Sequence, residues 1–138
     1  KQFEESSSST IKEINKKSEY YKRKFMLLNL WGNKKIYQKF KINIQKLSDY
    51  LKKKKIKKID FLKIDTEGYE YEILTGLGKK ISCVNTLMFE HHYDSMIKKN
   101  YTFNDINKLL LKNNFKLIYK SKMPFRKTFE YIYKKKER

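Results

Sequence analysis

Two short segments of this chain carry side chains that can transfer protons or bind ions. Carboxylates and imidazoles are common general acids and bases in enzymes. In open α/β sheets, ligands bind beyond the carboxyl ends of the parallel strands. Because each segment follows an apolar run, we expect both to face one crevice, where they could orient or deprotonate a substrate. The six side chains are those of Asp65, Thr66, Glu67, Glu90, His91 and His92.

Each segment also has a purely structural interpretation, which does not exclude a function. The acidic groups of residues 65–67 could satisfy the free amides at a helix start, with Gly68 permitting the turn. Residues 90–92 could be a polar loop entry whose histidines bond backbone groups. If the strand stays extended, Glu90 and His92 point to one face and His91 to the other. Only one histidine could then join Glu90.

The elements that must position these groups follow from the apolar pattern. Residues 59–65 form a short apolar run typical of a buried strand, and residues 66–68 turn the chain. Apolar side chains then recur at helical spacing over residues 69–77, and Gly76 and Gly78 close this helix. A second apolar strand at residues 84–90 follows. This order predicts a parallel crossover unit.

After this unit, Thr102 and Asp105 predict a capping box at the start of a further helix that ends near Asn113 and Asn114. Residues 116–122 and 128–133 alternate apolar and polar side chains, as an antiparallel hairpin does. From residue 59 onward the predicted order is therefore β-α-β-α-β-β, an α/β fold with a terminal antiparallel hairpin.

The region before residue 59 carries weaker patterns. Residues 1–17 are polar and serine-rich and predict a loop that adds little to the core. Residues 19–28 predict a short helix ending near Gly32. Alternating Phe40, Ile42 and Ile44 indicate a strand, and a helix-like segment over residues 47–51 follows it.

Composition restricts the class of protein. The 138 residues suit a single domain, and 39% hydrophobic residues are too many for a disordered basic tail. Lys and Arg number 34 against 15 Asp and Glu, a net charge of +19. Arginine occurs only as Arg23, Arg126 and Arg138, so we expect a solvated lysine surface and no specific nucleic-acid readout. A non-catalytic basic module that binds nucleic acid or an acidic surface remains the alternative.

Other classes of site find little support. The single cysteine, Cys83, excludes an internal disulfide and makes a reducing cytoplasm the expected compartment. No apolar run is long enough for a membrane helix. We expect no metal site, because His92 and Asp94 lack the distal histidine of a non-haem iron triad. A hard divalent ion on Asp65, Glu67 and Glu90 is the alternative.

The residues around the first strand end carry a specific resemblance. The sequence IDFLKIDTEGYE at residues 59–70, with Ile73, Leu74 and Gly76 after it, closely resembles the central motif of FkbM-type methyltransferases. The serine cluster at residues 6–9 and the segments at 89–93, 101–103 and 122–131 are also similar to that family. The resemblance implies a class I, Rossmann-like methyltransferase sheet. In that sheet residues 59–65 would be the fourth strand, residues 84–90 the fifth, and the hairpin the sixth and seventh.

The chain departs from the family at its beginning. Such enzymes carry an acidic, glycine-rich cofactor loop after their first strand, and none is present in these 138 residues. We therefore expect residues 1–138 to be one partial domain, the C-terminal half of such a sheet, with residues 59–133 as its recognised core. Its partner would be the missing N-terminal half, and the isolated chain would be inactive.

The resemblance also implies the chemistry. The enzyme would use S-adenosylmethionine to methylate a hydroxyl acceptor, a sugar or a small molecule. Asp65 and Thr66 would contact the cofactor. Glu67, Glu90 and either His91 or His92 would orient or deprotonate the acceptor. Substituting Glu90 or His91 should then lower turnover more than cofactor binding.

Overall fold

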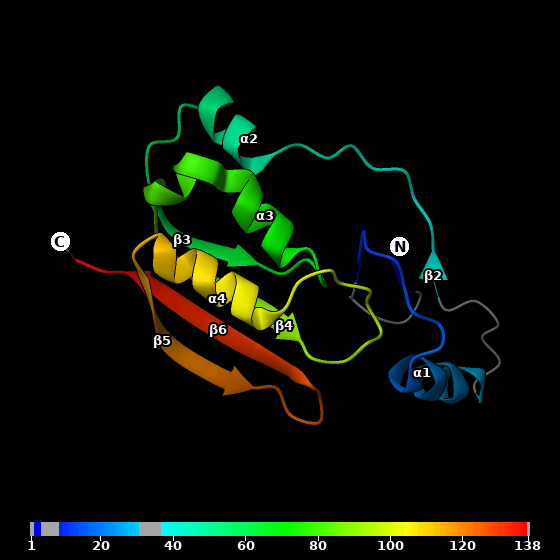
Figure 1. Ribbon diagram of the computed structural model, residues 1–138. Helices are drawn as coiled ribbons and strands as arrows, with labels where there is room; N and C mark the ends of the chain where they lie inside the picture. Colours follow the sequence, from blue (N-terminus) through cyan, green and yellow to red (C-terminus); the bar gives the residue numbers. More distant parts are fainter. Residues whose placement is uncertain (1, 4–8, 31–36, 138) are drawn as a thin grey trace.

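A computed structural model describes residues 2–3, 9–30 and 37–137, and its centre is a mixed four-stranded sheet (Figure 1). The strand order is β3-β4-β6-β5, with β3 parallel to β4 and the other neighbours antiparallel. The predicted β-α-β-α-β-β order from residue 59 is confirmed. The sheet consists of β3 (Ile59–Ile64), β4 (Val84–His92), β5 (Phe115–Lys122) and β6 (Thr128–Lys135). The other elements are β1 (Gln2–Phe3), α1 (Glu19–Asn29), β2 (Tyr37–Gln38), α2 (Leu47–Lys53), α3 (Glu70–Leu77), the 3-10 helix η1 (Gly78–Cys83) and α4 (Phe103–Lys112).

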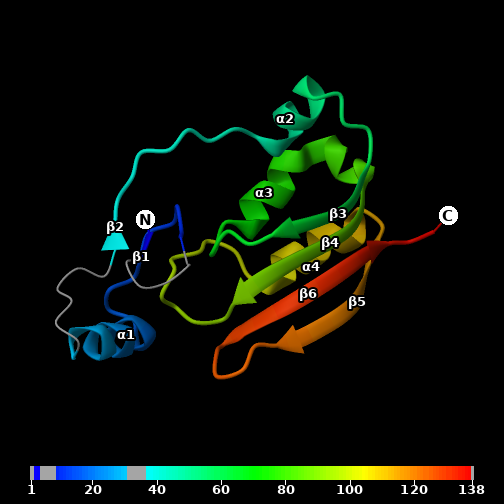
Figure 2. The ribbon, with the colours of Figure 1, turned by 180° about the vertical axis from the view of Figure 1, so that it is seen from behind.

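Helices α3 and α4 cover one face of the sheet, and Figure 2 shows the other face from behind. The covered face holds the core, because every second residue of a strand points the same way. Leu87 and Phe89 of β4 and Tyr131 and Tyr133 of β6 are completely buried there. Apolar residues of α3 and α4 complete this core: Leu74, Leu77, Ile106 and Leu110.

The start of α4 is fixed by the capping box that the sequence predicted. Thr102 Oγ1 accepts a hydrogen bond from the Asp105 amide at 3.4 Å, and the Asp105 carboxylate accepts from the Thr102 amide at 2.8 Å. At the other end, Asn114 takes a left-handed conformation with φ 64°. Both helix ends therefore agree with their side-chain signals.

Removing this cap should have a measurable cost. Replacing Thr102 by Ala is expected to lower the free energy of unfolding by about 1 kcal/mol, because one helix amide loses its acceptor. Urea denaturation of the full chain measures this change. The control is Asn104→Ala, an exposed position in the same helix that should leave stability unchanged or slightly higher. Equal losses in the two variants would contradict the capping role.

One predicted strand is wrong. Residues 39–46 are extended but pair with no strand in the described part of the chain, and the nearby two-residue β2 pairs with β1 instead. Phe40, Ile42 and Ile44 are 58%, 62% and 70% exposed. Alternation alone does not make a strand without a neighbour to bond and a face to cover.

Helix α1 is confirmed and ends at Asn29, while the predicted stop at Gly32 lies outside the described residues.

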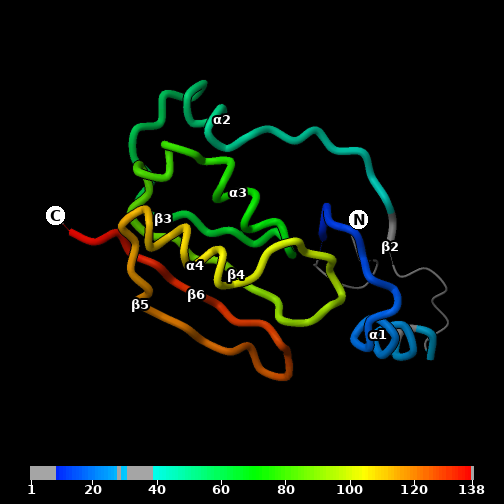
Figure 3. Tube along the Cα trace, viewed as in Figure 1, coloured from blue at the N-terminus to red at the C-terminus, as the bar shows by residue number. Residues whose placement is uncertain are grey.

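The N-terminal segment packs more closely than its composition predicts. Thr10 and Ile14 are buried, and Ile14 bridges to Ile97 in the loop after β4. Backbone hydrogen bonds join Asn15 to Met96 at 2.7 Å and Lys98 to Glu13 at 2.9 Å. Figure 3 traces this segment past the end of the sheet at which β3 and β4 finish. The serines at positions 6–8 lie outside the described residues.

Candidate active site

The turn after β3 and the end of β4 lie side by side, because the two strands are parallel and Ile64 pairs with Phe89. Two consecutive residues of this turn have positive φ, 48° at Glu67 and 97° at Gly68. A Cβ at position 68 would lie 2.6 Å from Ile97 Cγ2, so only glycine fits without displacement. The turn thus brings the segment after β3 against the loop after β4.

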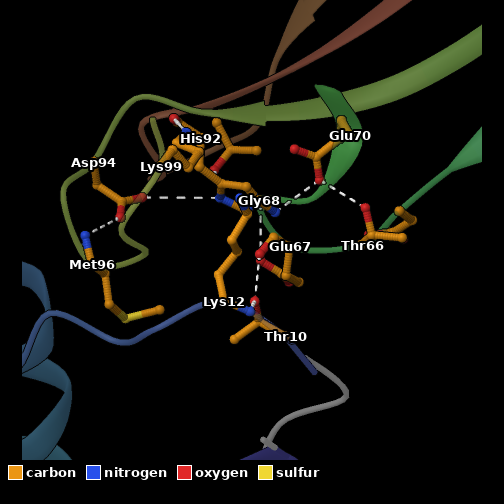
Figure 4. A network of polar contacts seen from close by, with 12 residues as sticks. Thr10, Lys12, Thr66, Glu67, Gly68, Glu70, His92, Asp94, Met96 and Lys99 are labelled. Atoms are coloured by element: carbon orange, nitrogen blue, oxygen red, sulfur yellow. Dashed lines mark hydrogen bonds and ion pairs between the residues drawn. The ribbon is translucent and has the colours of Figure 1, made fainter. Parts of the chain in front are cut away.

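Glu67 and His92 meet at this junction (Figure 4). Glu67 Oε2 lies 3.0 Å from His92 Nε2, and the two side chains are 16% and 10% exposed. On the other side of the ring, His92 Nδ1 lies 3.0 Å from Thr128 Oγ1 and 3.9 Å from Asp94 Oδ2. The imidazole therefore has a carboxylate near each ring nitrogen, Glu67 in close contact with Nε2 and Asp94 farther from Nδ1.

This environment changes the proton affinity of His92. Burial alone would lower its pKa, but the hydrogen bond and charge of Glu67, aided by Asp94 and Glu70, outweigh burial. The net pKa is raised, because a neighbouring carboxylate stabilises the protonated ring. Glu67 and His92 can therefore share and move a proton.

His91 lies on the opposite face of β4, as the alternation of an extended strand requires. Its ring lies edge-on to Tyr93 with centroids 4.8 Å apart, and 5.9 Å from the ring of Phe103 in α4. Burial, with the charges of Lys99 and His92, lowers the His91 pKa to about 3. His91 is a neutral member of an aromatic cluster, and it does not join Glu67.

Glu90 shares a face with His92 and lies opposite Glu130 in the register of β4 and β6. Burial and the nearby charge of Asp65 raise the Glu90 pKa, while His92 acts in the opposite direction. Asp65 itself is exposed and lies 3.2 Å from the Lys63 ammonium. The structure thus brings Asp65, Glu67, Glu90 and His92 to one end of the sheet, whereas the His91 ring lies on the opposite face of β4.

A cavity of about 1130 Å³ opens beside this end of β3. Asp65 and Thr66 line it from the strand end, Tyr69 lines it just before α3, and Glu72 lines it from within α3. Residues 44–47 and Tyr50 line it from the side of α2. Its volume lies just above the range of about 300–1,000 Å³ that is typical of small-molecule and cofactor sites.

Several residues of this site were not among those predicted from the sequence. Glu70 is completely buried, and its carboxylate accepts hydrogen bonds from Thr66, Gly68 and Tyr101. Lys99 donates to the His92 carbonyl oxygen. The bond between Thr66 and Glu70 joins residues close in the sequence, whereas Tyr101 and Lys99 join the site only through the fold.

The N-terminal segment supplies two more contacts, which its serine-rich composition did not predict. Thr10 Oγ1 donates to the Glu67 carbonyl oxygen at 2.7 Å. Lys12 forms an ion pair with Glu72, and its ammonium lies 5.0 Å from the ring centroid of Tyr69. This segment therefore covers the turn that carries Glu67.

Across residues 2–3, 9–30 and 37–137, no group of three or more His, Cys, Asp or Glu side chains is arranged to hold a metal ion. Within the same ranges, no helix has the length and apolar character needed to cross a membrane.

Comparison with known proteins identifies the family. No curated protein and no solved structure matches the chain. The family described as Methyltransferase FkbM domain matches residues 3–117, from β1 into β5, which include the turn after β3 and the end of β4. The assignment indicates a methyltransferase and agrees with the mixed α/β fold. With most of its length matched, this chain belongs to the FkbM methyltransferase domain family.

Proposed function

We propose that this chain carries the acceptor side of an S-adenosylmethionine-dependent O-methyltransferase site. The observation that carries the proposal is the contact of Glu67 with His92 at the carboxyl ends of two parallel strands. Glu67 directly follows Asp65 and Thr66, which line the cavity. Ligands bind at such strand ends in open α/β sheets. A hydroxyl acceptor, with carbohydrate as one candidate class, is the proposed substrate.

The residues that line the cavity fit one side of the cofactor. The Asp65 carboxylate and the Thr66 hydroxyl are suited to bind the ammonium and carboxylate groups of a methionine moiety. When bound, the cofactor supplies a sulfonium methyl group for in-line displacement. The role of the protein is to align the acceptor oxygen and to exclude water.

The acceptor hydroxyl must lose its proton to a base, and Glu67 in contact with His92 can supply that base. Glu67 lies against His92, so a proton from a hydroxyl can pass to a carboxylate whose negative charge is partly balanced by the ring. Glu90, with its raised pKa, is a second candidate for this role on the same face. His91 is not proposed as the base, because its ring lies among aromatic side chains on the other face.

The rest of the cofactor site is proposed to come from another segment. The strand order β3-β4-β6-β5, with one parallel and two antiparallel pairings, agrees with the second half of a class I, Rossmann-like sheet. The glycine-rich turn of such sheets is not among these 138 residues. We therefore propose that the active form is a longer protein that contains this chain together with such a turn, named here the full-length product, and we expect the 138 residues to be inactive alone.

The test is cofactor binding by that full-length product, measured by calorimetry, together with methyl transfer to a panel of sugars and small hydroxyl compounds. Asp65→Asn is expected to weaken S-adenosylmethionine binding about 10-fold, because one charge-assisted hydrogen bond is lost. The matched control is Asp60→Asn at the opposite end of β3, where the carboxylate pairs only with exposed groups.

Two results would contradict the proposal. One is a full-length product that binds S-adenosylmethionine but methylates nitrogen or carbon and no hydroxyl. The other is an equal effect of Asp65→Asn and Asp60→Asn on cofactor binding. In that case the end of β3 would not be the binding site.

A further inference from the structure

Glu70, the first residue of α3, is a buried acidic side chain with no surface role. It is 0% exposed. Its Oε1 accepts from the Gly68 amide at 2.8 Å and from Thr66 Oγ1 at 3.2 Å, and its Oε2 accepts from the Tyr101 hydroxyl at 2.6 Å. One carboxylate therefore holds residues on both sides of Glu67 and ties them to the segment after β4.

This carboxylate holds a turn that is costly to form. Glu67 has a positive φ of 48°, and a left-handed conformation costs a non-glycine residue about 1–2 kcal/mol. The Gly68 amide points into the protein, where it needs an acceptor. Glu70 supplies this acceptor from a side chain, because α3 starts only two residues later.

The three groups around Glu70 are all donors, which suits a carboxylate. A carboxylate only accepts hydrogen bonds and has lone pairs for all three of these donors. Burial and the charge of Glu70 raise the pKa of Tyr101, so its hydroxyl keeps its proton and donates. Lys99, whose ammonium lies 5.9 Å from the Tyr101 ring centroid, brings a positive charge near this cluster.

We propose that Glu70 is a positioning residue: it fixes the Thr66–Gly68 backbone so that the Glu67 carboxylate faces His92. Glu70 makes no hydrogen bond or ion pair with His92 and acts on it through the turn, apart from the effect of its charge. Glu70 holds this turn whether or not the chain transfers methyl groups, and only the effect of Glu70 on turnover rests on the proposed function.

The test separates the reach of the Glu70 side chain from its charge. Glu70→Asp keeps the charge but withdraws the carboxylate by one methylene, whereas Glu70→Gln keeps the reach and loses the charge. The Gln oxygen can still accept from Gly68, and the Tyr101 hydroxyl can accept from the Gln amide. NMR titration of His92 in the full chain is the readout, and it is simple because the sequence has two histidines.

A positioning role predicts that Glu70→Asp lowers the His92 pKa by at least half as much as Glu67→Gln does, and by more than Glu70→Gln. It also predicts that Glu70→Asp has little further effect when Glu67 is already Gln, since the two changes act through one contact. The matched control is Asp60→Asn, which removes an exposed charge at the opposite end of β3 and should leave the His92 pKa unchanged.

The inference is overturned if Glu70→Gln lowers the His92 pKa as much as Glu70→Asp, because the charge alone would then explain the effect. Equal shifts from Glu70→Asp with and without Glu67 would overturn it too. Failure of methyl transfer by the full-length product, with these titrations as expected, would reject the proposed function and leave the positioning role standing.

Discussion

Replacing Gly68 by Ala is expected to lower the free energy of unfolding by about 2–5 kcal/mol, the sum of backbone strain and overpacking. The backbone φ of 97° is one that residues with a side chain rarely adopt. The added Cβ would also lie 2.6 Å from Ile97 Cγ2, in a loop that Ile14 and Met96 hold in place. Urea denaturation followed by circular dichroism measures the loss.

The control for this prediction is another glycine of the same region. Gly76 lies in α3, and a Cβ there would meet no atom within 4 Å. Gly76→Ala should therefore raise the free energy of unfolding by up to about 1 kcal/mol, because alanine favours helix. If the two variants unfold at the same urea concentration, the close contact with Ile97 does not constrain position 68.

Under the proposed function, replacing Glu67 by Gln is expected to reduce methyl transfer by the proposed full-length product about 10²-fold or more, the usual contribution of a general base. Gln has nearly the same shape and can still bond to His92, but it accepts no proton. With the carboxylate gone, burial dominates and the His92 pKa falls. Initial rates against acceptor concentration should show the loss in kcat.

Glu67→Gln should also change how the free energy of unfolding depends on pH. The folded-state pKa of His92 is raised above the unfolded value of about 6.5. The contact therefore contributes its full stability below about pH 6.5, and this contribution is lost as the pH rises through the folded-state pKa. The difference in free energy of unfolding between wild type and Glu67→Gln should be larger at about pH 6 than at about pH 9.

The pH dependence must be measured as a difference between wild type and Glu67→Gln because His91 also changes stability with pH. Its folded-state pKa is lowered to about 3, so its contribution has the opposite sign and is lost as the pH falls. His91 is common to both proteins and cancels in the comparison. Glu13→Gln, which breaks only the exposed pair with Lys98, is the control and should show little pH dependence. A difference that grows with pH would contradict the raised His92 pKa.

Much of the sheet could be predicted because its signals are local. Strand β3, the turn at Gly68 and α3 follow from apolar spacing and one glycine, and the ends of α4 follow from Thr102 and Asn114. The failed strand at residues 39–46 had the same kind of signal. Its alternating side chains found no neighbouring strand among the described residues, and pairing depends on the rest of the chain.

The candidate site was predictable in position and less so in composition. Asp65, Glu67 and Glu90 could be expected at one sheet edge, since two parallel strands end there. Glu70 belongs to the motif at residues 59–70, which gave it no role. Its burial and its bond to Tyr101 arise because the loop after β4 folds back over α3. Thr10 reaches the Glu67 carbonyl from 57 residues away, a contact that no local pattern could indicate.

The β-α-β unit, the groups that end its strands and the family could all be predicted from the sequence, because these depend on residue types at short spacing. The sequence also left two histidines as equal candidates. Only the tertiary structure separated them: strand alternation sends His91 into the aromatic cluster under α4, while His92 meets Glu67. The deciding factor is what surrounds each ring, since burial without a carboxylate keeps His91 neutral and a carboxylate lets His92 hold a proton.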